Sequence, residues 1–330
     1  MNSKHVRRLL ALALAAAYAA AAPPAASTSR PTPEPPSARP PRVVALGTVQ
    51  DAGLPQPGCT CERCAAARRD PARRRYVASL ALVVPRSGHT WLIDATPDLP
   101  AQIDRIQTWR PHPQGRPDRA PVDGVLLTHA HIGHYLGLAL FGFEAINTRE
   151  LPVYASPRMG AFLRANGPWS QLVGKRNIAL REFRPGEPFV LDAGVTVTPI
   201  AVPHRDEFTD TMAFLVRGPH RSLLYVPDTD GWASWPRPLP EVLRGVDVAI
   251  LDGTFFSPDE LPDRDLTKIR HPLITGTMDL LAPLVRAGRL RVLFTHLNHS
   301  NPALDPLGAA RRAIEARGFG VLAEGDELSL

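Results

Sequence analysis

The sequence predicts an α/β sandwich whose functional site lies along one edge of a sheet. Strand-like apolar runs and helical stretches alternate from about residue 43 to the end of the 330-residue chain. Several His and Asp residues directly follow strand-like runs, so they are expected where strands end. A hydrophobic fraction of 44% with 21% charged residues is typical of a globular protein with a full core.

The patterns place each expected element along the chain. Strands are expected at residues 43–46, 80–84, 91–93, 125–127, 195–200, 212–216, 223–226, 248–251 and 292–294. Helices are expected at residues 99–108, 158–165, 278–287 and 307–317.

The first 22 residues have the pattern of a secretory signal peptide. Lys4, Arg7 and Arg8 precede an Ala- and Leu-rich run over residues 9–22, which is short for a membrane span. Residues 23–42 are rich in Pro, Ser and Ala and are expected to form a disordered linker. We expect an exported, periplasmic protein with one domain over residues 43–330 and no stable membrane span after signal cleavage.

The net charge of +6 does not indicate a nucleic-acid partner. Residues 1–42 hold six basic residues and one acidic residue, so the remainder of the chain carries a net charge of only +1. The Arg-rich stretch at 68–75 is interpreted as a solvated helix face rather than a binding stripe. A small-molecule substrate is therefore expected.

Three histidines, His129, His131 and His134, lie within six residues directly after the apolar run 125–127. A strand ending in such a turn can aim several imidazole nitrogens at one point, and imidazole binds zinc, iron and related ions. A His-rich surface turn is the alternative interpretation. Candidate ligands that recur later in the chain favour a metal site.

Three later residues, His204, Asp228 and His296, each stand at the end of an apolar strand-like run. His204 and Asp228 both follow a Val-Pro pair that ends the run. Each residue alone would be an ordinary loop residue. Together with the three clustered histidines, they indicate a metal centre built at strand ends.

On these residues the chain resembles the metallo-β-lactamase fold superfamily of metallo-hydrolases, over residues 43–330. The family pattern is His-x-His-x-Asp-His, then a His, a bridging Asp and a last His. The resemblance implies a four-layer αββα sandwich with metal between the inner sheet edges. It implies a first metal site of His129, His131 and His204 with Asp228, and a second site of His134, His296 and the shared Asp228.

Gly133 departs from the family pattern, which has a ligand Asp at that position. Without this carboxylate the second site keeps only two histidines and a share of Asp228. We therefore expect the first site to bind metal tightly and the second weakly or not at all. Asp94, after the run 91–93, matches an Asp to which the resemblance gives a structural role beneath the site.

Cys59, Cys61 and Cys64 form a Cys-x-Cys-x-x-Cys motif after the first expected strand. This spacing brings three thiolates together, and a fourth ligand would complete a structural zinc site. A disulfide with one free thiol is the alternative in an exported protein. The motif is similar to that of a superfamily branch containing coenzyme PQQ synthesis protein B and the phosphonate-pathway cyclic phosphodiesterase.

The resemblance to the phosphodiesterase implies His299 as the fourth zinc ligand, although His299 could instead complete the second catalytic site. The stretches 94–98 and 298–302 also look like PQQ synthesis protein B. Proteins of the PQQ synthesis protein B type generally lack the first two histidines of the cluster, which this chain retains. We therefore interpret the chain as a paralogue of the cofactor protein.

Two further residues are candidates near the site. His271 lies in a loop and could donate a proton to a leaving group, with a solvated loop His as the alternative. Asp252 ends the run 248–251 and either supports a ligand through a hydrogen bond or caps the turn.

The preferred function is metal-dependent hydrolysis of a phosphoester, ester or lactone-like centre, with a metal-activated water oriented by Asp228. The expected cofactor is zinc, with iron or manganese as alternatives at the catalytic site. A non-haem iron oxygenase is the second hypothesis, because two His and one carboxylate form its ligand set. A non-catalytic metal-binding paralogue is the third.

Overall fold

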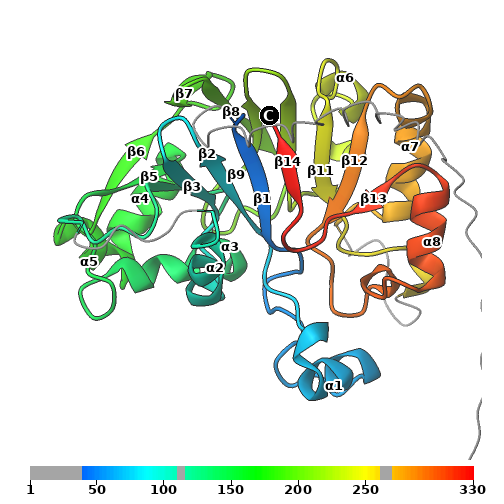
Figure 1. Ribbon diagram of the computed structural model, residues 1–330, viewed down its shortest axis with the longest axis horizontal. Helices are drawn as coiled ribbons and strands as arrows, with labels where there is room; N and C mark the ends of the chain where they lie inside the picture. The colour runs from blue at the N-terminus through cyan, green and yellow to red at the C-terminus, as the bar shows by residue number, and fades with distance from the viewer. Residues whose placement is uncertain (1–38, 110–115, 261–269) are drawn as a thin grey trace, which may run out of the picture. The chain divides into compact units, whose positions relative to one another are not determined.

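The computed structural model describes residues 39–109, 116–260 and 270–330 (Figure 1). The expected signal peptide, 1–22, and nearly all of the expected linker, 23–42, lie outside the described residues and stay predictions. The first strand, β1 (Arg42–Gly47), begins at the last residue of that linker. In the described part of the chain, no helix is long and apolar enough to cross a membrane.

Two seven-stranded sheets form the framework, with the strand orders β14-β1-β2-β3-β4-β5-β6 and β13-β12-β11-β10-β9-β8-β7. The first sheet contains β1, β2 (Ser79–Val84), β3 (His89–Ile93), β4 (Gly124–Leu126), β5 (Leu151–Ala155), β6 (Ile178–Glu182) and β14 (Glu327–Ser329). The second contains β7 (Phe189–Asp192), β8 (Val195–Val202), β9 (Thr211–Arg217), β10 (Ser222–Val226), β11 (Val248–Asp252), β12 (Arg291–Thr295) and β13 (Gly320–Val321).

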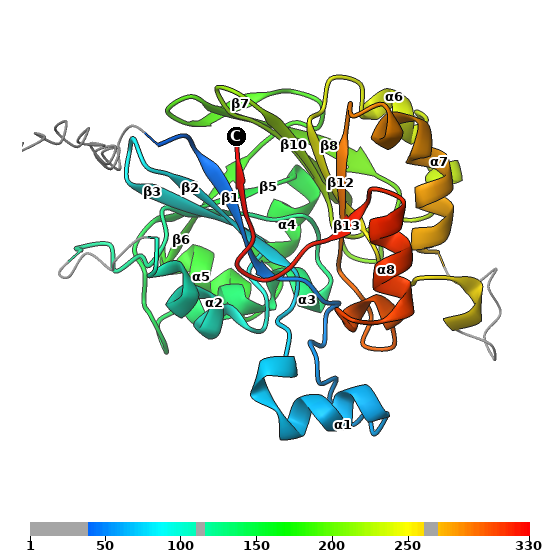
Figure 2. The same cartoon turned by 45° about the vertical axis from the view of Figure 1, so that its right-hand side comes forward.

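Helices cover the outer face of each sheet (Figures 1 and 2). The first sheet is covered by α2 (Leu99–Ile106), α3 (Ile132–Tyr135), α4 (Pro157–Ala165) and α5 (Trp169–Gly174). The second is covered by α6 (Leu239–Val242), α7 (Ile274–Arg286) and α8 (Ala309–Ala316). A third apolar cluster fills the space between the sheets. These four layers confirm the predicted αββα sandwich.

Strand β1 shows why the strands are apolar on both faces. Val44 and Leu46 pack with the helices of the outer layer, whereas Val43 and Ala45 pack between the two sheets. Alternate side chains of a strand point to opposite faces, so a sheet covered on both sides needs continuous apolar runs. Those runs are the signal that predicts the strands correctly.

Five strands were not predicted, namely β5, β6, β7, β13 and β14, because each has a weak local pattern. Strand β5 contains Pro152, which argues against a strand in sequence. Strand β6 becomes exposed along its second half, and β13 has only two residues. Pairing with neighbouring strands defines these segments.

The cysteine motif lies on a separate element rather than entirely in a loop. Cys64 belongs to helix α1 (Glu62–Arg69). Only the last two residues of α1 fall in the stretch 68–75 that was expected to be a helix face, and the start of the helix was not predicted although Ala and Arg are strong helix formers. Helix α1 lies below the two sheets in both views (Figures 1 and 2). Cys64 and Ala67 are buried against Val49 and Leu54.

The strand ends bring the site together. Strands β10, β11 and β12 are parallel, so their carboxyl ends lie at the same edge of the second sheet. Asp228 follows β10 after Pro227, Asp252 is the last residue of β11, and His296 directly follows β12. The first three histidines follow β4 in the other sheet, so the centre lies where the two sheets meet.

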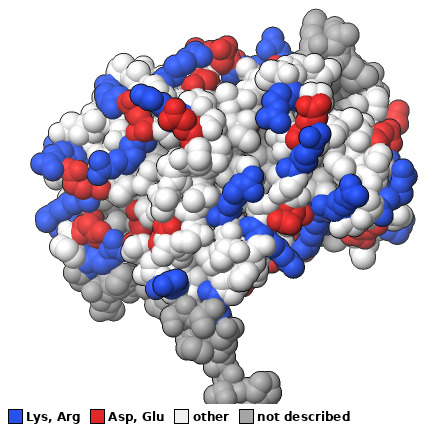
Figure 3. Space-filling view, turned by 90° about the horizontal axis from the view of Figure 1, so that it is seen from above, with Lys and Arg blue, Asp and Glu red and all other residues white. Residues whose placement is uncertain are grey.

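Basic and acidic side chains are mixed over the face of the molecule seen in Figure 3. Nucleic-acid-binding surfaces instead gather Lys and Arg on one face. On this face, no such stripe is visible among the described residues.

Candidate metal centre

The first cluster consists of His129, His131, His204 and Asp228, whose ligand atoms all lie within 4.8 Å of one another. His131 Nδ1 lies 2.9 Å from His129 Nε2 and 3.2 Å from His204 Nε2. Asp228 Oδ2 lies 3.0 Å from His204 Nε2 and 3.4 Å from His129 Nε2. The structure therefore brings together the four residues predicted for the first site.

These separations fit a divalent cation with four ligands. For metal–ligand bonds of about 2.0–2.1 Å, the corners of a tetrahedron lie about 3.3–3.4 Å apart. The shortest separation between two ligand atoms is 2.9 Å, and the separation of His131 Nδ1 from Asp228 Oδ2 is 3.8 Å. Imidazole and carboxylate donors suit zinc, and also iron or manganese.

Each histidine of the centre has its other ring nitrogen beside an oxygen acceptor. The pairs are His129 with Thr128 Oγ1 (3.0 Å), His131 with Glu207 Oε2 (3.2 Å), His204 with Asp230 Oδ1 (3.3 Å), His134 with Asp94 Oδ2 (2.7 Å) and His296 with Thr254 Oγ1 (3.1 Å). A nitrogen that donates to such an oxygen leaves the opposite nitrogen free for a metal and fixes the ring.

The second cluster consists of His134, His296 and Asp51, with ligand atoms again within 4.8 Å of one another. Asp51 Oδ1 lies 3.6 Å from His134 Nε2 and 3.8 Å from His296 Nε2. These three atoms are buried, and no hydrogen-bond partner for them exists among the described residues. Asp228 Oδ2 lies 4.0 Å from His134 Nε2, so Asp228 stands between the two clusters.

Asp51 is the residue that the sequence reasoning missed. It lies shortly after β1, and the same signal, a polar ligand type just past a buried strand, had identified the other ligands. Burial alone would raise the pKa of Asp51, but the imidazoles of His296 and His134 lower it well below its usual range. Asp51 is therefore ionised at neutral pH.

Asp94 holds His134 in position. Its backbone has a φ of 68°, a left-handed conformation that is rare for residues other than glycine. Its Oδ1 accepts a hydrogen bond from Thr128 N at 2.8 Å, and its Oδ2 accepts one from His134 Nδ1 at 2.7 Å. Such conformations persist where surrounding contacts hold them, and they gather at functional sites.

Asp94→Asn is expected to weaken metal binding at the second cluster by about 10–100-fold, because outer partners of ligand histidines have effects of that size. Competition with a chromogenic chelator measures this affinity. Asp104→Asn, the same change at an exposed position of α2, is the control. An unchanged affinity in the Asp94 variant would show that Asp94 does not position His134 for a metal.

His271 stands beside both the first cluster and Asp252. Its Nδ1 lies 2.9 Å from Asp252 Oδ2 and 3.3 Å from Asp228 Oδ1. Burial alone would lower the pKa of His271, but the Asp252 and Asp228 carboxylates raise it to about 9. Asp252 also accepts a hydrogen bond from Thr254 N at 2.9 Å. Asp252 therefore fixes both the turn after β11 and the ring of His271.

The cysteine motif gathers a separate set of potential ligands. The sulfurs of Cys59, Cys61 and Cys64 and a ring nitrogen of His299 lie within 4.8 Å of one another. All three thiols are free. His299 thus lies with the cysteines, as the first interpretation expected, and not with the second cluster. Arg63 fixes the backbone of this loop by donating to His299 O at 3.0 Å.

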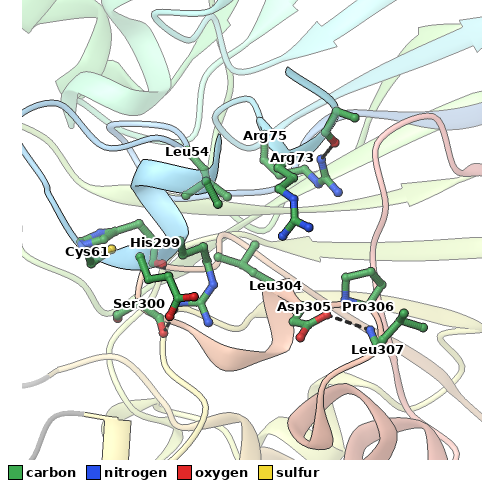
Figure 4. A pocket seen from close by; sticks show the side chains of 14 residues that line it. Leu54, Cys61, Arg73, Arg75, His299, Ser300, Leu304, Asp305, Pro306 and Leu307 are labelled. Carbon is green, nitrogen blue, oxygen red and sulfur yellow. Dashed lines mark hydrogen bonds between the residues drawn. The ribbon is translucent and has the colours of Figure 1, made fainter. Parts of the chain in front are cut away.

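A pocket of about 760 Å³ adjoins this cysteine cluster (Figure 4). Cys61 and His299 line one part of it, and Arg73 and Arg75 line another. None of the lining residues belongs to the two His and Asp clusters. The pocket is therefore a feature of the cysteine segment and not the entrance to the metal centre.

Residues 89–297 match the family model described as "Beta-lactamase superfamily domain". The chain therefore belongs to the β-lactamase superfamily. More particularly, it is similar to coenzyme PQQ synthesis protein B. The protein from Rhodopseudomonas palustris is 31% identical over 321 residues, covering 88% of this chain and 99% of that relative. The one from a Methylobacterium species is 29% identical over 308 residues, covering 88% and 100%.

Solved structures agree with this assignment. Zn²⁺-bound PqqB from Methylobacterium extorquens superposes with a TM-score of 0.74 at 25% identity, covering 88% of this chain and 100% of that one. A diphosphatase from the PhnP family superposes with a TM-score of 0.61 at 22% identity, covering 88% and 97%, and shows the same fold. The predicted resemblance to this superfamily and branch is confirmed.

Proposed function

We propose that the protein is a metal-dependent hydrolase acting on a phosphoester, ester or lactone-like centre of a small molecule. The observation that supports this proposal is the presence of two ligand clusters around one shared carboxylate, Asp228. Its Oδ2 lies 3.0 Å from His204 Nε2 in the first cluster and 4.0 Å from His134 Nε2 in the second. Hydrolases with two metals hold them about 3.5–4 Å apart, where both attacking and leaving oxygens are stabilised.

The residues of the centre have separate tasks in this reaction. A divalent ion held by these ligands would lower the pKa of a bound water to near neutrality and polarise a substrate oxygen. Asp228, whose side chain is 3% exposed, orients the attacking water. His271 is 16% exposed, and its raised pKa keeps it protonated at neutral pH, so it donates a proton to the leaving group.

Side chains near the centre favour a substrate with an apolar portion and a negative charge. Ile132 and Phe208 are 57% and 58% exposed, and they directly follow His131 and its partner Glu207 in sequence. Arg270 is 60% exposed and lies 3.7 Å from Asp230, the acceptor for His204.

An iron-dependent oxygenase is the second candidate. Asp51, His134 and His296 form a set of two histidines and one carboxylate, which is the ligand set of non-haem iron oxygenases. The three imidazoles of the adjacent first cluster and the shared Asp228 favour the hydrolase, because an oxygenase needs only one such set. Hydrolysis without dioxygen distinguishes the two candidates.

The test compares zinc-, manganese- and iron(II)-loaded protein on bis(p-nitrophenyl) phosphate, p-nitrophenyl acetate and a simple lactone, with and without dioxygen. We expect hydrolysis without dioxygen that a chelator removes and added metal restores. Turnover that needs both iron and dioxygen would favour the oxygenase. Metal binding without either activity would indicate the non-catalytic paralogue.

His271→Asn is expected to lower kcat by about 10²–10³-fold, because a positioned general acid contributes an effect of that order. The metal content should stay unchanged, since His271 lies beside the ligands without completing either cluster. His220→Asn, at an exposed position, is the control and should retain full activity. Full activity in the His271 variant would exclude its role as proton donor.

A further inference from the structure

We propose that Asp51 is the carboxylate ligand of the second metal position. It would replace the Asp that the superfamily pattern places between the second and third clustered histidines, where this chain has Gly133. The inference rests on the proposed function only in treating the site as a metal centre. It assigns a ligand from a different segment of the chain, beyond the family's ligand motif.

The first support is steric. A Cβ atom at residue 133 would lie 2.2 Å from Asp51 Oδ1 and 2.6 Å from Asp51 Cα. Real Cβ contacts are never this short, so a side chain at 133 and Asp51 in its present position exclude each other. The space that a carboxylate from residue 133 would enter is filled by the carboxylate of Asp51.

The second support is the backbone that carries Asp51. Val49 and Leu297 form a short parallel bridge. Leu297 N donates to Thr48 O at 3.0 Å, and Gln50 N donates to Leu297 O at 3.0 Å. Because Leu297 directly follows His296, these hydrogen bonds anchor the segment before Asp51 beside a histidine of the second cluster. The position of Asp51 is therefore built into the fold.

The third support is a set of buried atoms without partners. The Nδ1 atoms of His134 and His296 are held by Asp94 and Thr254, so their Nε2 atoms are the free ones. Both histidines are 0% exposed, and neither these Nε2 atoms nor Asp51 Oδ1 has a hydrogen-bond partner within the described ranges. Buried polar atoms are rarely left unpaired, and a cation between these three atoms would satisfy all of them.

The consequence is that the second position has its own carboxylate as well as a share of Asp228. Its own donors are two imidazoles and one carboxylate, the three protein ligands of a catalytic zinc site, and Asp228 Oδ2 stands 4.0 Å from His134 Nε2. The expectation drawn from Gly133 alone, a weak or empty second position, is replaced by a tightly held second ion.

The experiment is a cobalt(II) titration of the metal-depleted full-length protein, with zinc per chain measured by elemental analysis. The variants are Asp51→Asn, which keeps the shape of the side chain, and Asp51→Ala. His134→Ala is the positive control, and Asp104→Asn, on the surface of α2, is the negative control. Thiolate absorption bands report the cysteine cluster in each variant and show that its segment is folded.

We expect both Asp51 variants and His134→Ala to lose one ion per chain, or to bind it more than about 100-fold more weakly. The first cluster and the cysteine cluster should each keep their metal ion. If Asp51→Asn and Asp51→Ala bind all ions as the wild type does, the proposal is overturned. The Asp51 variants could lose the ion while the wild-type protein shows no hydrolytic activity. That outcome would uphold Asp51 as a ligand and reject only the proposed hydrolysis.

Discussion

Replacing Asp228 with asparagine is expected to lower kcat/KM of the proposed hydrolysis by about 10³-fold or more, equivalent to about 4 kcal/mol of transition-state stabilisation. Asp228 belongs to the first cluster, and its Oδ2 also lies 4.0 Å from Nε2 of His134 in the second. Burial alone would raise the pKa of Asp228, but His271 and His296 lower it well below its usual range. The substitution therefore removes a buried negative charge that both metal positions need.

The matched control for Asp228→Asn is Asp230→Asn. Asp230 accepts from His204 Nδ1 at 3.3 Å and belongs to neither metal-ligand cluster. Its substitution should have a smaller effect, about 10–100-fold in metal affinity or activity. Steady-state kinetics and metal content of both variants measure the difference. Equal effects of the two substitutions would contradict the bridging role of Asp228.

Replacing Cys64 with serine is expected to remove one zinc ion and to lower the free energy of unfolding by about 4 kcal/mol or more, as loss of a structural metal does. Cys64 is 0% exposed, and burial raises the pKa of its thiol to about 11. A buried thiol of this kind needs a metal to become the thiolate ligand. We expect the Tm to fall by about 5–10 °C in thermal unfolding.

Thr60→Ser, an exposed position between two of the cysteines, is the control and should leave the Tm unchanged. A second comparison separates zinc from a disulfide. If the cysteines bind zinc, a chelator lowers the Tm of the wild type and a reductant does not. If a reductant destabilises the wild type and a chelator has no effect, the cysteines form a disulfide instead.

The sequence predicts much of the metal centre because most ligands follow continuous apolar strands. His204 and Asp228 each follow a strand that a proline ends, and both lie where that pattern places them. Cys64 and His299 were likewise expected together. They are far apart in sequence, and only the resemblance to a family with this motif linked them.

Asp51 follows a buried strand as the other ligands do, but this signal does not show that it joins His134 and His296, because its position depends on a distant contact. The bridge between Val49 and Leu297 joins segments from opposite ends of the domain, and no local pattern encodes it. Gly133 indicated only that a carboxylate was missing from the motif. The oxygen partners of the histidines, such as Thr254 and Glu207, were missed for the same reason, since loop residues become neighbours only through tertiary packing.

The measurement that most directly tests the metal centre is elemental analysis of the protein purified without dioxygen from unsupplemented cells. Four groups of converging ligands are present among the described residues, and the one formed by Asp228, Asp252 and His271 shares Asp228 with the first cluster, so three separate sites remain, two in the shared centre and one at the cysteines. We expect about three zinc ions per chain and no iron, since each of the three sites supplies three or four ligands of the types that zinc binds. One zinc with one iron ion per chain would contradict the two-metal hydrolase and favour oxygen chemistry at the centre.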